Sequence, residues 1–225
     1  MKTAVLGTGT VGRTIAARLV ELGHTVTIGT RDPETTLSRT ADNAMGTASF
    51  AVWAADNPGV DVAPFADAAA GAELIVNATS GGASLEVLGQ VGAENLDGKI
   101  ILDIANPLDF SIGMPPTLFV KDTDSLGEQI QRTFPAARVV KSLNTLNADL
   151  MAHPARLSDP GTVFVSGNDV DAKATVTGLL KDFGHQDVID LGDITTARGT
   201  EMLLPVWLRL WGALGSPAFN FKIVR

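Results

Sequence analysis

Short apolar runs alternate with stretches of helical periodicity along nearly the whole chain. The apolar runs predict eight strands, at residues 2–6, 25–29, 59–63, 73–78, 99–105, 138–143, 162–167 and 188–191. Several of them, such as 74–76 and 100–102, are apolar without alternation, as expected for strands that are covered on both faces. Strands that alternate with helices are typical of a mostly parallel sheet. We therefore expect an α/β fold.

Between the strands, the hydrophobic period changes to steps of three and four residues. The first residues that follow this spacing are Val11, Ile15, Leu19 and Leu22. They predict a helix that Gly23 ends. Residues 169–183 predict a second helix, because acidic residues open the segment and a lysine stands near its end, as the helix dipole favours.

A glycine-rich run follows the first predicted strand, and it reads Gly7-Thr8-Gly9-Thr10-Val11-Gly12. Gly7 permits a tight turn, Gly9 lets a pyrophosphate approach the backbone, and Gly12 lets the following helix pack closely on the strand. The pyrophosphate then lies at the helix N-terminus, held by backbone N–H groups and the dipole. Because the run lies between a strand and a helix, it predicts dinucleotide binding by these residues. A glycine turn with a purely structural role is the alternative.

The end of the second predicted strand indicates which dinucleotide is bound. Folds that bind NAD usually place an acidic residue there, against the ribose 2′-hydroxyl. This chain has Thr30-Arg31 instead, and a hydroxyl beside a guanidinium suits a 2′-phosphate. We therefore predict NADP(H) as the cofactor. In the alternative interpretation, Arg31 is a solvated loop residue and Asp32 is the ribose ligand.

Small polar residues follow the fourth and fifth predicted strands. Thr79 and Ser80 follow the fourth strand, and Ala105-Asn106-Pro107 follow the fifth. The carboxyl ends of parallel strands form the ligand-binding edge of open α/β sheets. We expect these residues to contact the cofactor, although ordinary turn chemistry would use the same residue types.

Together these elements predict a Rossmann-type, doubly wound fold. Two proline-rich stretches, 105–124 and 151–161, interrupt the alternation of strands and helices. The first predicts a long loop, and long loops in compact domains are often functional. The second marks a boundary between an NADP-binding Rossmann domain at 1–150 and a smaller C-terminal α/β part at 151–225. We expect the smaller part to complete a cleft for a second ligand.

Composition and charge narrow the classes of function. A formal net charge of -8 leaves no basic face for a nucleic-acid backbone, so we expect no nucleic-acid partner. The longest apolar run, 202–208, is far shorter than the roughly 20 residues that a membrane span needs. Met1-Lys2 leads directly into the first predicted strand, without room for a signal peptide, so we expect a cytoplasmic protein.

The absent residue types limit the chemistry. The chain has no Cys and no Tyr, which excludes thiol catalysis and the Tyr and Lys pair of short-chain reductases. His24, His153 and His185 are read as turn residues, with a catalytic His paired to a carboxylate as the alternative, and we expect no metal site. The protein therefore offers no obvious acid to protonate a carbonyl. A flavin-like ring, which delocalises its own charge, would need no catalytic acid or base from the protein.

Five segments carry a resemblance to a known family, namely 7–12, 29–31, 139–145, 190–198 with Glu201, and 221–223. With these segments the chain resembles the NADPH-dependent deazaflavin reductases, which transfer hydride between NADP(H) and coenzyme F-420. The resemblance implies that Thr8, Thr30 and Arg31 hold the 2′-phosphate. It also implies that a second-ligand region approaches the nicotinamide and the deazaflavin ring, and this region is Asn144, Leu146, Thr195 and Thr196.

The hydride acceptor, the catalytic role and the C-terminal tryptophans each allow more than one interpretation. Family members often have His where Asn144 stands, and the family resembles the cytoplasmic domain of membrane ferric reductases, so a flavin or ferric acceptor is an alternative. A non-catalytic NADP(H)-binding sensor is another. Trp207 and Trp211 stand at helical spacing in an apolar stretch that Pro205 is expected to kink. They could form a homodimer contact, a lid over the second ligand, or part of the core.

Overall fold

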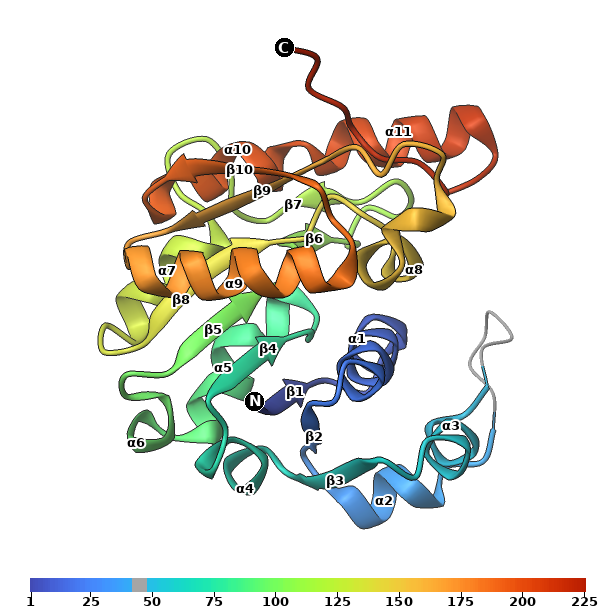
Figure 1. The fold of residues 1–225 in the computed structure, drawn as a ribbon, viewed down its shortest axis with the longest axis vertical. Helices are drawn as coiled ribbons and strands as arrows, with labels where there is room; N and C mark the ends of the chain where they lie inside the picture. The colour runs from blue at the N-terminus through green and yellow to red at the C-terminus, as the bar shows by residue number, and fades with distance from the viewer. Residues whose placement is uncertain (42–47) are drawn as a thin grey trace.

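The computed structural model describes residues 1–41 and 48–225, and its main feature is an eight-stranded sheet (Figure 1). The strand order is β10-β9-β8-β5-β4-β1-β2-β3. All neighbouring strands pair in parallel except β8 and β9, which are antiparallel. The strands are β1 (Lys2–Leu6), β2 (Thr25–Thr30), β3 (Val60–Pro64), β4 (Leu74–Asn77), β5 (Ile100–Asp103), β8 (Arg138–Ser142), β9 (Thr162–Gly167) and β10 (Asp187–Gly192). The predicted mostly parallel Rossmann-type fold is confirmed.

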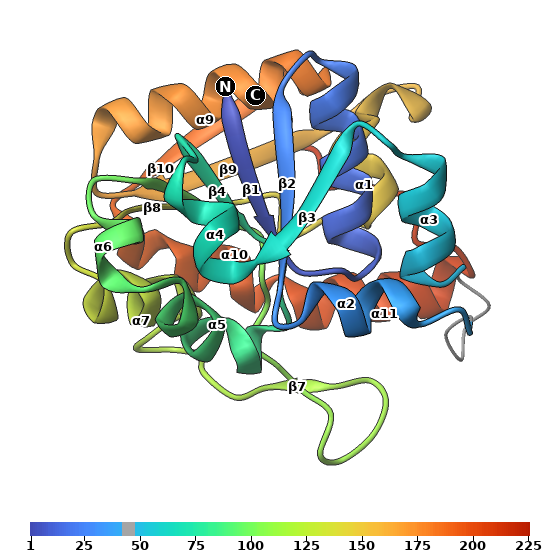
Figure 2. The ribbon, with the colours of Figure 1, turned by 90° about the horizontal axis from the view of Figure 1, so that it is seen from below.

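Helices cover both faces of the sheet (Figure 2). On one face lie α1 (Thr10–Glu21), α3 (Phe50–Asp56), α8 (Ala148–Ala152) and α9 (Val170–Phe183). On the other lie α4 (Phe65–Ala70), α5 (Ser84–Val91), α6 (Ala93–Leu96), α7 (Leu126–Thr133) and α10 (Ala197–Met202). The short α2 (Pro33–Ser38) follows β2, and three single turns of 3-10 helix are η1 (Gly81–Ala83), η2 (Pro154–Arg156) and η3 (Ile194–Thr196).

The two covered faces explain the uninterrupted apolar strands. Consecutive strand residues point to opposite faces, and both faces are packed. In β1, Val5 belongs to the core on the α1 side, while Leu6 belongs to the core on the α4 side. Ile101 and Leu102 of β5 divide in the same way. A polar residue in such a strand must therefore find a buried partner.

The segment after β5 differs from a plain loop. It contains a short antiparallel pair, β6 (Leu108–Asp109) with β7 (Thr117–Leu118), which extends away from the main sheet (Figure 2). The helix α11 (Leu204–Leu214) packs against this pair through a small apolar cluster of Leu118, Leu204 and Trp207. The expected kink at Pro205 is instead a break at Leu203, which separates α10 from α11. Pro205 lies in the first turn of α11, where a missing N–H group is tolerated.

The sheet continues past the expected boundary near residue 151, because β9 and β10 extend it beyond β8. The division into parts at 1–150 and 151–225 thus stays a prediction. Within the described ranges, no helix is long and apolar enough to cross a membrane.

Candidate functional site

The predicted contact residues gather at the carboxyl edge of the sheet. The glycine turn follows β1. Thr30 is the last residue of β2, and Arg31 follows it. Asn106 follows β5, and Asn144 follows β8. The strand order reverses its direction between β1 and β4, and this point is where open α/β sheets form their ligand crevice. The sequence motifs are therefore at the geometrically expected place.

The glycine turn is tightly packed on one side and open on the other. A Cβ on Gly7 would lie 2.6 Å from the Ala78 carbonyl oxygen, and one on Gly12 would lie 2.1 Å from the Gly7 carbonyl oxygen. A Cβ on Gly9 would meet no atom of the described residues within 4 Å. Gly9 also caps α1 without a side-chain hydrogen bond to the first-turn N–H groups. This is the cradle that a pyrophosphate requires, so the turn fits a dinucleotide.

A hollow of about 370 Å³ lies beside the end of β2, and we call it the β2 hollow. It brings together Thr8, Thr30 and Arg31, the three residues predicted to hold the 2′-phosphate. Thr30 is buried, and its hydroxyl is 2.8 Å from that of Thr36. The Arg31 side chain is 71% exposed, and its nearest anionic partner is Glu86 at 3.5 Å. The Arg31 guanidinium is therefore accessible to a ligand.

The structure gives Asp32, the alternative ribose ligand, a different role. Its carboxylate accepts hydrogen bonds from the Thr35 N–H at 3.0 Å and the Thr35 hydroxyl at 2.5 Å, and so caps α2. The Thr35 hydroxyl, followed by the Thr35 N–H, lowers the pKa of Asp32 below its usual value. Arg39, at the other end of α2, also lines the β2 hollow. Sequence reasoning missed Arg39, because only the helix brings it back beside Arg31.

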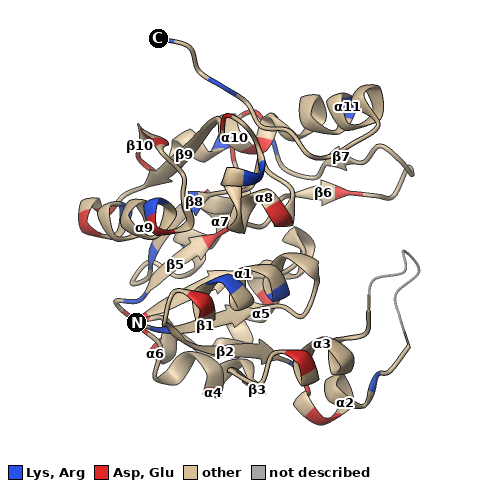
Figure 3. Cartoon of the chain, turned by 45° about the vertical axis from the view of Figure 1, so that its right-hand side comes forward, with Lys and Arg blue, Asp and Glu red and all other residues tan. Residues whose placement is uncertain are grey.

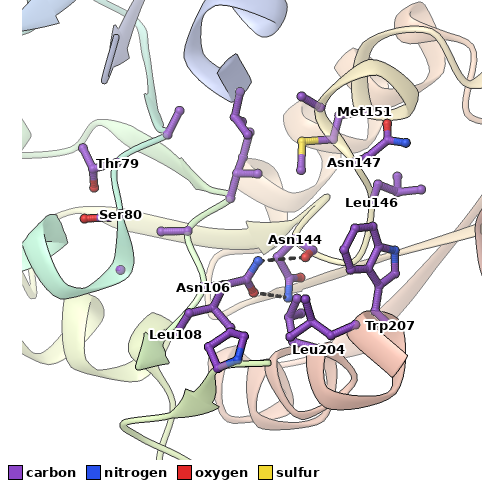
Figure 4. A pocket seen from close by; sticks show the side chains of 18 of the residues that line it. Thr79, Ser80, Asn106, Leu108, Asn144, Leu146, Asn147, Met151, Leu204 and Trp207 are labelled. Carbon is purple, nitrogen blue, oxygen red and sulfur yellow. Dashed lines mark hydrogen bonds between the residues drawn. The ribbon is translucent and has the colours of Figure 1, made fainter. Parts of the chain in front are cut away.

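A second cavity of about 500 Å³, the central cavity, lies on the other side of the glycine turn (Figure 4). One wall contains five predicted cofactor contacts, namely Val11, Thr79, Ser80, Ala105 and Asn106. The facing wall contains Asn144 and Leu146 of the predicted second-ligand region, and Met151, Leu204 and Trp207 extend it. None of the described lining residues is charged. The cavity therefore suits uncharged, largely apolar rings.

Two asparagine side chains join the walls of the central cavity. The Asn106 Nδ2 donates to the Asn144 carbonyl oxygen at 2.9 Å, and the Asn144 Nδ2 donates to the Asn106 Oδ1 at 3.0 Å. The Asn144 Nδ2 is also 3.1 Å from the Thr200 carbonyl oxygen. Figure 4 shows this reciprocal pair at the floor of the cavity. It fixes the end of β5 relative to the end of β8.

A buried ionic cluster lies directly behind this floor. The Lys141 ammonium is 2.9 Å from the carboxylates of both Asp103 and Glu201, and all three side chains are at most 1% exposed. The ammonium also donates to the Ala105 carbonyl oxygen in the cavity wall. Burial lowers the pKa of Lys141, but the two facing carboxylates outweigh this effect, so the pKa is raised above its usual value. Lys141 is therefore charged.

Glu201 connects this ionic cluster to a further helix. Its two carboxylate oxygens accept the N–H groups of Leu126 and Gly127 at 2.8 and 3.1 Å, in the first turn of α7. The cluster thus ties β5, β8, α7 and α10 together beneath the cavity. Sequence reasoning assigned it no role, although a lysine inside a strand covered on both faces was a signal for a buried ion pair.

The structure does not bring every predicted residue to the cavities. Thr195 and Thr196 belong to η3, where the Thr195 hydroxyl donates to Asp193 at 2.5 Å and the Thr196 hydroxyl donates to Ser166 at 2.7 Å. Neither lines the β2 hollow or the central cavity. Thr10 and Pro107 flank the lined surface without contributing to it.

In the part of the chain that the structure describes, no histidine lines either cavity. His185 is buried, and its Nε2 lies 2.9 Å from the Met151 carbonyl oxygen. Burial lowers the pKa of His185. Within residues 1–41 and 48–225, no group of three or more His, Cys, Asp or Glu side chains could hold a metal ion. The central cavity thus offers hydroxyl and amide groups to a ligand, and no acid or base.

The aromatic residues of α11 belong to both the core and the cavity wall. Trp207 is 7% exposed, and its ring stacks on Phe219 at 5.4 Å and meets the Trp211 ring edge at 5.5 Å. Both tryptophans line the central cavity. Trp207 can therefore pack in the core and contact a ligand at the same time. Trp211 is 40% exposed, so it contributes less to the core.

Three comparisons with known proteins indicate the same family. Residues 2–107 match the family described as NADP oxidoreductase, coenzyme F420-dependent. A crystal structure of a protein from Arthrobacter sp. FB24, described as a putative F420-dependent NADP reductase, is 66% identical over 100% of both chains, with a TM-score of 0.95. The F420-dependent NADP reductase of Methanothermobacter marburgensis is 29% identical over 93% of this chain and 92% of its own length.

A third relative is a larger protein. The metalloreductase STEAP3 of Rattus norvegicus is 30% identical over 212 residues, which is 92% of this chain. The chain spans only 38% of the length of that relative. The similarity therefore concerns one part of the metalloreductase.

Proposed function

Since this chain belongs to the family of coenzyme F420-dependent NADP oxidoreductases, we propose that it transfers a hydride between NADP(H) and coenzyme F420. The observation that carries the proposal is the central cavity, which is uncharged and opens beside the glycine turn. In the reducing direction, bound NADPH would supply the hydride, F420 would accept it, and solvent would supply the accompanying proton. The two ring cofactors supply the redox chemistry.

The described residues account for binding of the dinucleotide. The open side of Gly9 and the N-terminus of α1 receive the pyrophosphate. From there the adenosine end extends to the β2 hollow, where Thr8, Thr30 and Arg31 hold the 2′-phosphate. Val11 and the other residues that line the central cavity would receive the nicotinamide end.

The chain's role in the transfer itself is to position the rings and to exclude water. The apolar walls of the central cavity stack the two rings, and the Asn106 and Asn144 pair keeps the walls at a fixed separation. Among the described lining residues, no side chain can act as an acid or base at neutral pH, and a delocalised acceptor needs none. We therefore assign no catalytic residue.

Absorbance spectroscopy tests the proposal directly. We expect that mixing the protein with NADPH and oxidised F420 bleaches the visible absorbance of the deazaflavin ring at a rate proportional to protein concentration. The same assay with NADH is the matched control for the cofactor. Absence of bleaching with both dinucleotides would refute the proposal.

A flavin or ferric acceptor is the second candidate, and the similarity to a metalloreductase favours it. The central cavity would then hold a flavin beside the nicotinamide. Oxidation of NADPH in the presence of a flavin, with no oxidation in the presence of F420, would establish this alternative.

A non-catalytic sensor requires a closed pocket beside the nicotinamide. The central cavity, with about 500 Å³ next to the glycine turn, counts against a sensor. The cytoplasmic location, the homodimer and the two-part division of the chain stay predictions. Size-exclusion chromatography with light scattering tests the homodimer.

A further inference from the structure

A third hollow of about 580 Å³ adjoins the central cavity, and we call it the basic groove. The two share Met114, Pro116 and Leu208 in their linings, so they form one continuous surface. The groove runs between the β6–β7 segment and α11, on the side of the central cavity remote from the glycine turn. Figure 3 shows α11 beside β7. The one basic residue of α11 is Arg209.

The groove differs from the central cavity in its charge. Lys121 and Arg209 line it, and no carboxylate does so among the described residues. Neither cation forms an ion pair in the described ranges, and both residues are exposed. The Thr117 hydroxyl is a further donor in the same lining. The lining thus holds two unpaired cations and no described carboxylate, and this arrangement attracts an anionic ligand.

The two cations of the basic groove contrast with the negative charge of the chain as a whole. The protein carries a net charge of -8, so its overall field repels an anionic ligand, which must be held by local cations. The planar fork of Arg209 and the compact ammonium of Lys121 both suit phosphate or carboxylate groups. The uncharged central cavity could not accept such groups without a desolvation penalty.

We propose that the basic groove binds the anionic side chain of the ring ligand whose ring occupies the central cavity. The inference rests on the proposed function, and it specifies that function further. Coenzyme F420 carries a chain with a phosphodiester and glutamyl carboxylates on its deazaflavin ring. With the ring in the central cavity, this chain leaves past Met114 and Leu208 and reaches Lys121 and Arg209.

The experiment compares two probes that have the same ring. One is F420, and the other is its riboflavin-level analogue, which has the deazaflavin ring and ribityl chain but no phosphate or carboxylate. Dissociation constants are measured by equilibrium fluorescence titration without NADPH, for the wild type and for Lys121→Ala with Arg209→Ala. The control is Lys181→Ala, which removes an exposed cation of α9 that lines none of the three hollows.

We expect the double variant to weaken binding of F420 relative to the analogue by about tenfold, a moderate effect because both cations are solvated. The preference of the wild type for F420 should fall as salt is added, and Lys181→Ala should retain that preference. Equal weakening for both probes, or no weakening for either, would overturn the inference and leave the proposed function intact. If the double variant weakens F420 selectively in the titration, but the wild type mixed with NADPH in the absorbance assay reduces neither probe, the proposed function fails while the groove assignment stands. If the wild type binds neither probe, both proposals fail.

Discussion

The β2 hollow and the central cavity lie on opposite sides of one glycine turn, and they are built in different ways. The β2 hollow comes mainly from one continuous stretch around Thr30 and Arg31, with the Arg31 side chain 71% exposed. The central cavity combines the ends of β4, β5 and β8 with α8 and α11, and a buried ionic cluster supports its floor. The first site is a surface feature, whereas the second depends on the integrity of the fold.

This difference predicts that the largest effect on stability comes from the support of the central cavity. Lys141→Met leaves Asp103 and Glu201 buried without their cation, and we expect a loss of about 3–5 kcal/mol in the free energy of unfolding. Urea denaturation measures this loss. The control is Arg132→Met, which breaks an ion pair to Asp124 with Arg132 59% exposed and should cost less than about 1 kcal/mol. Similar losses in the two variants would contradict the comparison.

The same cluster has a defined dependence on pH. Because the pKa of Lys141 is raised in the folded protein, its stabilising contribution is complete below the ordinary lysine pKa of 10.5. The contribution is lost as the pH rises through the raised folded value. The contribution of Lys141 to the stability of the wild type should therefore be constant across neutral pH and decrease only in strong alkali, as urea denaturation at several pH values would measure.

The second prediction concerns the turn that the two sites share. In Gly12→Ala, the new methyl group would meet the Gly7 carbonyl oxygen at 2.1 Å, so the turn must open. We expect a loss of about 1–3 kcal/mol in stability, together with weaker NADPH binding. The methyl group of Gly9→Ala meets no described atom within 4 Å, so this variant should retain the stability of the wild type. Its methyl group would still obstruct the pyrophosphate, so calorimetric titration should show weaker NADPH binding in both variants. Equal stability of the two variants would contradict this account.

The third prediction is that a change in the β2 hollow affects NADPH binding without affecting the stability of the fold. Arg31→Ala removes an exposed cation and should leave the stability unchanged, while the dissociation constant for NADPH rises about tenfold. Binding of NADH, which has no 2′-phosphate, should change less than about twofold. Arg156→Ala, at an exposed arginine outside the hollow, is the matched control. Equal losses for NADPH and NADH would refute the assignment of Arg31 to the phosphate.

The two sites also differ in how far the sequence predicted them. The glycine turn and Thr30-Arg31 were predictable because the strand, the turn and the helix that form them are neighbours along the chain. The cluster of Lys141, Asp103 and Glu201 was not, since its members come from three distant segments. Its one local signal was the lysine within the apolar strand β8. The positions of Arg39 in the β2 hollow and of Arg209 in the basic groove likewise could not be predicted, because they depend on how α2 and α11 pack in the folded chain.

The smallest expected effect concerns the second-ligand region. It compares Asn144, which lines the central cavity, with Thr195, which only the family resemblance assigned to the second ligand. Asn144→Ala leaves the Asn106 Oδ1 and the Thr200 carbonyl oxygen without their donor, and each lost bond costs about 0.5–1.5 kcal/mol. The KM for F420 should therefore rise a few-fold, while that for NADPH changes little. Thr195→Ala removes only a hydroxyl that pairs with Asp193 outside the cavity. Steady-state kinetics should show no change beyond error for this variant. A larger increase in the KM for F420 with Thr195→Ala than with Asn144→Ala would place the deazaflavin ring against η3 and outside the central cavity.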